Sequence, residues 1–156
     1  MQHRQIDVGF SPNIITSTTI SSRVVYKKNF VIILPENHPV NADTFTDLSI
    51  FANDPFILPP LHERLGYVES IQAMCQAHGY LPKIACESAY SGTVLRLVEA
   101  GMGISIEPAS TLRGQNLRLK TIELTHLPQK AAMQMLWLTE RTVELEPFFS
   151  LVNRIL

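Results

Sequence analysis

The sequence predicts an α/β fold with a mostly parallel sheet. Short apolar segments of strand length alternate along the chain with segments whose apolar residues recur every three or four positions, as in helices. Prolines and glycines separate these segments. One run, Phe30–Leu34, contains no polar residue, which is typical of a strand covered on both faces in a parallel sheet. This alternation favours βαβ units over an all-β or all-helical fold.

Composition and charge indicate a globular protein and argue against autonomous DNA binding. The 156 residues have a formal net charge of −1, with 46% apolar and 17% charged residues. This length favours one domain or two small lobes. The densest basic cluster is Lys27-Lys28, which is too small to release the counterions that DNA binding requires. We expect neither a signal peptide nor a membrane span, because no apolar run approaches the length of a spanning helix.

Cysteine and histidine usage predicts neither a metal site nor a cofactor. Cys75 falls on an apolar helix face and Cys86 in a strand, with no further Cys or His at ligand spacing. The five histidines form no HxH, HxxxH or HExxH pattern, and no GxSxG, P-loop or Rossmann glycine pattern occurs. We expect small buried thiols in a reducing cytoplasm, with a disulfide or metal pair as the alternative.

The first third of the chain predicts two strands and a short helix. Ile6–Phe10 is a strand that ends at a Ser-Pro turn, and residues 13–23 are a Ser/Thr-rich loop with some extended chain. The strand Phe30–Leu34 is followed by a turn at 35–39, where two prolines forbid a helix. Asp43 then opens a short helix. Its apolar side carries Phe45, Leu48, Phe51 and Ala52.

The middle of the chain alternates strands with helices. Strands are predicted at Pro55–Leu58, Lys83–Glu87 and Ile104–Ile106. A helix over Gly66–His78 separates the first two, because its apolar residues recur at helical spacing and Gly79 stops it. A second helix precedes the third strand. It ends at Gly101 or Gly103.

The last third predicts two strands and a closing helix. A short helical turn at Pro108–Leu112 is followed by an edge strand at Leu117–Leu124, where apolar residues alternate with charged ones. Met133–Leu138 is a further strand. Pro147–Leu156 is a helix, because its apolar residues lie at helical spacing and Pro147 suits the first turn.

A candidate anion site lies at the start of the second predicted helix. Ser88, Ser91 and Thr93 place hydroxyl groups around that start, and Gly92 permits close approach of the backbone. Unpaired N–H groups and the helix dipole make such a start a seat for a small anion. Ser91 acting only as an N-cap is the alternative. No nucleophile, acid or base accompanies the hydroxyl groups, so we expect a binding site and not an enzyme.

Taken together, four segments resemble the effector-binding domain of LysR-type transcriptional regulators. They are IDVGF at 6–10, NFVIILPENHPV at 29–40, PFILPP and GYVESIQAMCQAHGYLPKIACES within 55–88, and TVLRLVEAGMGISIEP at 93–108. The final MLWLTERTVELEPFFSLVNRIL also fits the family's ending. The resemblance covers nearly the whole chain, and the order and spacing of the segments make it specific.

The resemblance implies a type 2 periplasmic-binding-protein-like fold, in which two crossing strands join two α/β lobes. Lobe II would be 34–135 and lobe I would be 1–29 with 137–156. The family's DNA-binding winged helix-turn-helix and the first strands and helices of lobe I have no counterpart here, so lobe II is expected complete and lobe I incomplete. Another copy of the chain, or a swapped segment, would then cover an apolar face. That face would comprise Ile6, Val8, Phe10, Phe148 and Val152.

In this family a small metabolite, often a carboxylate, binds between the lobes, and the domain controls DNA binding by the full-length protein. The resemblance therefore implies a cytoplasmic regulator without a cofactor, whose partners are the effector, further copies of itself and, through the missing domain only, DNA. Three loops supply the predicted effector-binding residues. They are Gly9, Phe10 and Ser11; Leu58, Pro59 and Pro60, followed by Tyr67; and Tyr90, Ser91, Gly92 and Thr93.

Other interpretations stay open at this point. Tyr67 would otherwise pack against the helix surface, Pro59-Pro60 would only end a strand, and Gly9 would serve backbone shape alone. For the whole chain, the alternatives are a periplasmic-type solute-binding protein for a small anion, or an enzyme on the same lobed fold.

Overall fold

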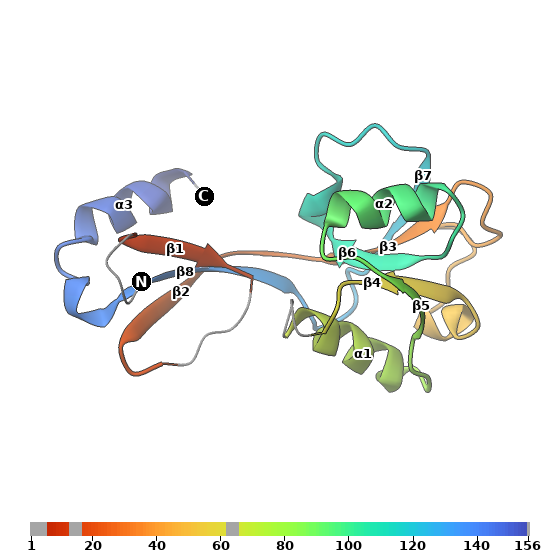
Figure 1. Ribbon diagram of the computed structural model, residues 1–156, viewed down its shortest axis with the longest axis horizontal. Coiled ribbons are helices and arrows are strands. Elements are labelled where there is room, and N and C mark those ends of the chain that lie inside the picture. The colour runs from red at the N-terminus through yellow and green to blue at the C-terminus, as the bar shows by residue number, and fades with distance from the viewer. Residues whose placement is uncertain (1–5, 13–16, 62–65, 156) are drawn as a thin grey trace. The chain divides into compact units, whose positions relative to one another are not determined.

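The computed structural model describes residues 6–12, 17–61 and 66–155. The chain divides into two compact units (Figure 1). Residues 1–27 and 131–156 form the first unit, and residues 28–130 form the second. Both units combine helices with strands, as the α/β prediction requires.

The second unit contains most of the helices and strands. Its elements are β3 (Phe30–Pro35), the 3-10 helix η1 (Leu48–Phe51), β4 (Pro55–Leu58), α1 (Tyr67–Ala77), β5 (Lys83–Glu87), α2 (Ser91–Glu99), β6 (Ser105–Pro108), the 3-10 helix η2 (Ala109–Leu112) and β7 (Leu119–Glu123).

A parallel β-bridge joins the two groups of paired strands in this unit. β4 and β5 pair in parallel, while β3 lies between β6 and β7. Phe56 of β4 forms a parallel bridge with Ile104, just before β6. The Ile57 N–H donates to the Ile104 carbonyl and the Ile104 N–H to the Pro55 carbonyl, both at 2.8 Å. The described strands of the unit therefore follow the order β5-β4-β6-β3-β7.

The direction of β3 differs from the sequence prediction. All its residues are buried, as the uninterrupted apolar run predicted. However, β3 is antiparallel to both β6 and β7, so the parallel pairing inferred from this run is wrong. Helices cover both faces of the sheet, with α2 and α1 on opposite sides (Figure 1). An apolar run thus reports burial of both faces and not strand direction.

The two α-helices of the second unit confirm the predicted periodicity. α2 packs Val94, Leu95 and Val98 against residues of β3 and β4. α1 also buries one apolar face. Its buried residues are Tyr67, Val68, Ile71, Met74 and Cys75.

In the first unit, the described strands form a three-stranded sheet with one covering helix. Its elements are β1 (Val8–Ser11), β2 (Ile20–Lys28), β8 (Ala131–Leu138), the 3-10 helix η3 (Thr139–Arg141) and α3 (Glu146–Ile155). β8 lies between β1 and β2, and it pairs with β1 antiparallel. Phe149 and Val152 of α3 pack on Met135 and Trp137 of β8, with the Trp137 and Phe149 ring centroids 4.5 Å apart.

Two local predictions need correction. No helix begins at Asp43, because the Asn41 side chain accepts the N–H groups of Asp43 and Thr44 and closes a turn instead. The 3-10 helix η1 starts later, where Asp47 caps the Ser49 N–H at 2.7 Å. β2 also extends from the predicted Ser/Thr-rich loop to Lys28, while residues 13–16 of that loop lie outside the described residues.

The prediction of two buried thiols is correct for one cysteine and only partly correct for the other. Cys75 and Cys86 are both free, so the disulfide alternative is wrong; Cys75 is buried and Cys86 half-buried. Burial raises the pKa of the Cys75 thiol.

The expected apolar face is only partly exposed. Val152 is buried on the inner side of α3, and Val8 is half-buried. The other members, Ile6, Phe10 and Phe148, are exposed.

Replacing Gly103 by alanine is expected to destabilise the second unit by about 1–3 kcal/mol. A Cβ atom at Gly103 would lie 2.5 Å from the Pro55 carbonyl oxygen, so the backbone of the bridge would have to move. Gly92→Ala is the matched control, because its Cβ would meet nothing within 4 Å. In urea unfolding, the control should be neutral or gain about 0.5–1 kcal/mol. Equal unfolding free energies for both variants would contradict the close approach at Gly103.

Candidate functional site

Two of the predicted loops meet at the carboxyl edge of the second unit's sheet. Leu58 and Glu87 are partners at the ends of the parallel strands β4 and β5. Beyond them, the Ser88 N–H donates to the Leu58 carbonyl at 3.1 Å and ties the two loops together. The loop that starts with Ser88 leads directly into α2. The structure therefore brings the segment 58–60 and the segment 90–93 to the same edge.

The start of α2 is open at its first turn. Tyr90 is the N-cap residue, so the alternative role of Ser91 as N-cap is wrong. The Thr93 and Val94 N–H groups donate to the Tyr90 carbonyl, whereas those of Ser91 and Gly92 donate to no described residue. Gly92 and Thr93 are exposed, and the Tyr90 side chain is 76% exposed. Accessible N–H groups at the positive end of a helix dipole are chemically suited to an anion.

The Ser91 hydroxyl, however, points into the protein. It donates to Oε2 of Glu107 at 3.1 Å, and the Thr111 hydroxyl donates to the same oxygen at 3.5 Å. Glu107 is a fully buried carboxylate in β6. An anion at the start of α2 would thus rely on backbone N–H groups instead of the Ser91 hydroxyl.

Sequence reasoning missed Glu107, although one signal was present. It is a charged residue within the otherwise uncharged strand segment 104–108, which the pattern placed in the sheet interior. A buried carboxylate needs hydrogen-bond donors, and hydroxyl groups at the start of the preceding helix are natural ones. Ser91 and Thr111 therefore have a structural role, which for Ser91 stands beside its candidate binding role.

Tyr67 occupies a packing position. Its side chain is buried, its hydroxyl donates to the Ile106 carbonyl at 2.5 Å, and its ring centroid lies 5.9 Å from that of Phe30. It fastens the start of α1 to β6, which favours the packing alternative. Leu58 and Pro59 are buried too, while Pro60 is half-buried. Effector contacts of these residues stay predictions.

In the first unit, the predicted site residues of β1 face in two directions. Phe10 is paired with Met135, which packs under α3, while Ser11 is paired with Gln134. Because successive side chains of a strand alternate between faces, Phe10 lies on the α3 side and Gly9 and Ser11 on the other. The side chains of Phe10 and Ser11 therefore belong to different surfaces. Their predicted roles, like the expected cleft between lobes, stay predictions.

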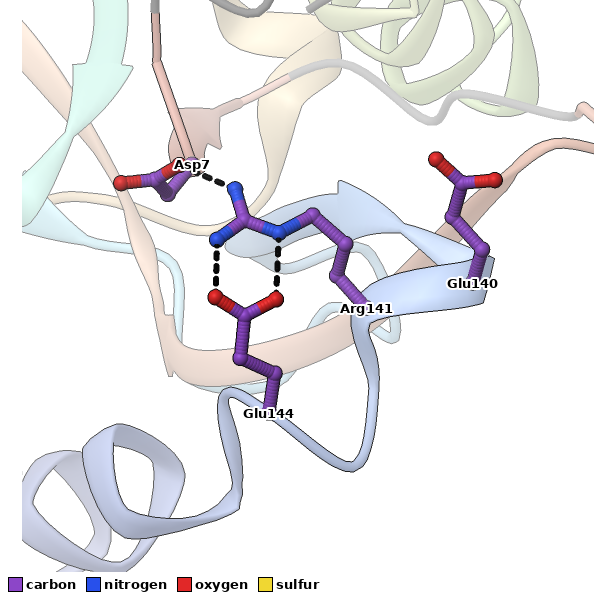
Figure 2. Close-up of a pocket in the computed structure, with 4 residues that line it drawn as sticks. All are labelled: Asp7, Glu140, Arg141 and Glu144. Carbon is purple, nitrogen blue, oxygen red and sulfur yellow. Dashed lines mark hydrogen bonds and ion pairs between the residues drawn. The ribbon is translucent and has the colours of Figure 1, made fainter.

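An ion-pair network lines a polar cavity of the first unit (Figure 2). Asp7, Glu140, Arg141 and Glu144 line about 690 Å³. Arg141 donates to both Glu144 carboxylate oxygens, at 2.9 and 2.6 Å, and to Asp7. These hydrogen bonds raise the Arg141 pKa and lower that of Glu144. Since two carboxylates already compensate the guanidinium, the network fastens the residue before β1 to the segment after β8 and offers no unpaired cation to an anion.

The described residues contain neither a metal-binding cluster nor a spanning helix. Within 6–12, 17–61 and 66–155, no group of three or more His, Cys, Asp or Glu side chains is arranged to hold a metal ion. In the same residues, no helix has the length and apolarity needed to cross a membrane.

Comparisons with known proteins agree on one family. The model of the "LysR substrate binding domain" matches residues 1–153. CatR, an HTH-type transcriptional regulator of Pseudomonas putida, is 27% identical over 143 residues, which are 92% of this chain and 48% of that protein. YnfL, an uncharacterized HTH-type transcriptional regulator of Escherichia coli K12, is 24% identical over 132 residues, 85% of this chain and 44% of that protein. The chain spans about half the length of these curated relatives.

Solved structures show the same fold. The effector-binding domain of BenM with its effector benzoate has a TM-score of 0.83 at 22% identity, and the match covers 98% of this chain and 70% of that one. The regulatory domain of Synechocystis PCC6803 CcmR in complex with 2-PG has a TM-score of 0.79 at 17% identity, with 99% and 76% covered. The predicted type 2 periplasmic-binding-protein-like class is thereby confirmed.

Loss of the Ser91 hydroxyl should destabilise the second unit. Ser91→Ala removes a hydrogen bond to a buried carboxylate, and we expect a cost of about 1–3 kcal/mol in the free energy of unfolding. Thr93→Ala, at an exposed position two residues along the same helix, should stay within about 0.5 kcal/mol of the wild type. Chemical denaturation measures both. A Ser91→Ala variant as stable as Thr93→Ala would contradict the inward orientation of the hydroxyl.

The ion-pair network should show a defined pH dependence. The folded-state pKa of Glu144 is lowered, so its stabilising effect is present above the ordinary Glu pKa of about 4.3 and is lost as the pH falls through the folded value. The Glu144→Gln variant should therefore have a lower melting temperature than the wild type at pH 7, and this deficit should shrink as the pH falls below the ordinary Glu pKa. Glu140→Gln, which lines the same cavity and pairs with no described residue, should match the wild type at pH 7. A Glu144→Gln deficit that does not change with pH would refute the ionic origin.

Proposed function

This chain belongs to the LysR substrate-binding domain family, and on that basis we propose that it is the effector-sensing regulatory part of a transcriptional regulator. The relatives are transcriptional regulators and not enzymes, which supports a binding role without catalysis. Because the chain spans about half of those relatives, we assign DNA binding to polypeptide outside it. The relatives do not favour the alternative of a periplasmic-type solute-binding protein. A transcriptional regulator works where the DNA is, so we also propose a cytoplasmic location.

We further propose that the effector is a small carboxylate held at the start of α2. The observation that carries this proposal is the pair of N–H groups, of Ser91 and Gly92, which point from the exposed first turn and donate to no described residue. The effector of the similar BenM domain, benzoate, is also a carboxylate. Tyr90, exposed beside these groups, offers an aromatic surface to the remainder of such a ligand.

The start of α2 by itself can provide only a small part of the affinity for an anion. A helix N-terminus stabilises an anion by about 0.3–1 kcal/mol when exposed and by about 2 kcal/mol when partly buried. This is too little for tight binding, so apolar contact must supply most of the binding free energy. This balance favours an aromatic or apolar carboxylate.

The regulatory effect follows from population shift. A ligand that binds one conformation of the domain more tightly than another raises the population of that conformation. A complete switch requires about 5.5 kcal/mol of differential affinity, so a weakly anchored metabolite shifts the equilibrium only in part. Graded control of transcription by metabolite concentration is the expected result for the full-length regulator.

A pair of variants at one position tests the role of the helix N–H groups. Ser91→Ala and Ser91→Pro both lose the hydroxyl, but only proline also removes the N–H group, and proline is well tolerated at the first helical position. Thermal-shift titration with benzoate and other aromatic monocarboxylates should show stabilisation that persists in Ser91→Ala. Their affinity should fall about tenfold in Ser91→Pro, because one hydrogen bond to a charged ligand is lost.

The matched neutral amides of the same acids are the ligand controls and should stabilise the protein less. Amides that bind as tightly as the acids would contradict the carboxylate preference. Equal carboxylate affinity in the alanine and proline variants would contradict the site at the α2 start.

A further inference from the structure

Two carboxylates, Glu107 and Glu123, flank Val31 in one row of the second unit's sheet. Val31 of β3 is the partner of Glu107 in β6 and of Glu123 in β7, and both pairings are antiparallel. Directly opposed residues of antiparallel strands project their side chains to the same face. Val31 belongs to the same core cluster as Val94 of α2. Both carboxylates therefore lie on the α2 side of the sheet, one on each side of Val31.

The first carboxylate connects the start of α2 to η2. Glu107 accepts hydrogen bonds from the hydroxyls of Ser91, the first residue of α2, at 3.1 Å and of Thr111, in η2, at 3.5 Å. Ala109 and Leu112 of η2 also pack against the core cluster that α2 helps to form. Because Glu107 is fully buried and needs these donors, a displacement of either helix is costly for the hydrogen bonds of the other.

The second carboxylate is bound by Asn29, next to the residue at which the second unit begins, Lys28. The Asn29 side chain donates from Nδ2 to Oε1 of Glu123 at 2.7 Å. Its carbonyl accepts the N–H of Ala109, the first residue of η2, at 3.0 Å. Asn29 thus fixes the start of η2 and the end of β7 together. The 3-10 helix η2 is therefore held from one side by Glu107 and from the other by Asn29.

We propose that η2 couples the carboxylate site at the start of α2 to Asn29, so that effector binding strengthens the attachment of η2 to Asn29. This inference rests on the proposed function and adds the route by which occupancy of the site reaches the beginning of the unit. An anion on the Ser91 and Gly92 N–H groups orders the first turn of α2. The ordered turn keeps the Ser91 hydroxyl on Glu107, which in turn keeps η2 docked. Docked η2 is the state that both ends favour.

Isothermal titration calorimetry of the whole chain with benzoate tests this coupling, because coupling between two sites is reciprocal. Asn29→Ala leaves the proposed site intact but removes the hydrogen bond to Glu123, and it should lower the affinity about fivefold. Asn53→Ala is the matched control, because it removes one hydrogen bond of an exposed asparagine, to Lys83 at 3.1 Å, in the same unit. Its affinity should stay within about twofold of the wild type. Equal affinities of the two variants would overturn the proposal.

A double-mutant cycle in urea unfolding tests the coupling without any ligand. No hydrogen bond among the described residues joins Ser91 directly to Asn29, so the effects of Ser91→Ala and Asn29→Ala on the unfolding equilibrium constant should multiply if the two sites are independent. With coupling, the double variant should deviate from that product by at least about threefold. The exposed Thr93→Ala, combined with Asn29→Ala, is the control and should show no deviation. A multiplicative Ser91–Asn29 cycle would overturn the proposal.

The two experiments separate this inference from the proposed effector. If benzoate and the other carboxylates do not bind the wild type but the Ser91–Asn29 cycle deviates, the effector assignment is wrong and the coupling is supported. If benzoate binds the wild type and loses affinity in Ser91→Pro, while the cycle is multiplicative, the effector assignment is supported and the coupling is wrong.

Discussion

The parallel bridge between Phe56 and Ile104 is the constraint on which the second unit depends. Two hydrogen bonds of 2.8 Å join the β4–β5 ladder to the β6–β3–β7 ladder. Because the bridge is parallel, the carboxyl ends of β4, β5 and β6 point the same way. The turn after β4, the start of α2 and Glu107 consequently meet at one edge. Gly103 permits this contact because any side chain there would collide with β4.

Sequence patterns predicted the elements of this fold better than their pairing. The apolar run of β3 and the helical spacing of α1 and α2 record which faces are buried, and burial is what these patterns encode. The run of β3 carries no information on the direction of its neighbours, so its antiparallel pairing was missed. The helix expected at Asp43 does not form, because the Asn41 side chain accepts hydrogen bonds from the N–H groups of Asp43 and Thr44. The spacing of apolar residues does not reveal such local hydrogen bonds.

The candidate site was likewise predicted in position but not in orientation. Hydroxyl residues before an apolar helix located the start of α2 correctly, since helix boundaries have local signals. The direction of the Ser91 hydroxyl depends instead on Glu107, sixteen residues away in another element. The sequence likewise did not predict the orientation of Tyr67, whose hydroxyl donates to the backbone of β6. Non-local partners decide whether a polar side chain serves a ligand or the core.

Because the two free thiols differ in burial, their chemical labelling can report local opening of the second unit. Cys86 is partly accessible, whereas Cys75 lies on the buried face of α1, where burial disfavours its thiolate form. A thiol-reactive dye would modify Cys86 in the native state but reach Cys75 only when α1 lifts from the sheet. The labelling rate of Cys75 therefore measures how often that helix detaches, and ligands that rigidify the unit would slow it.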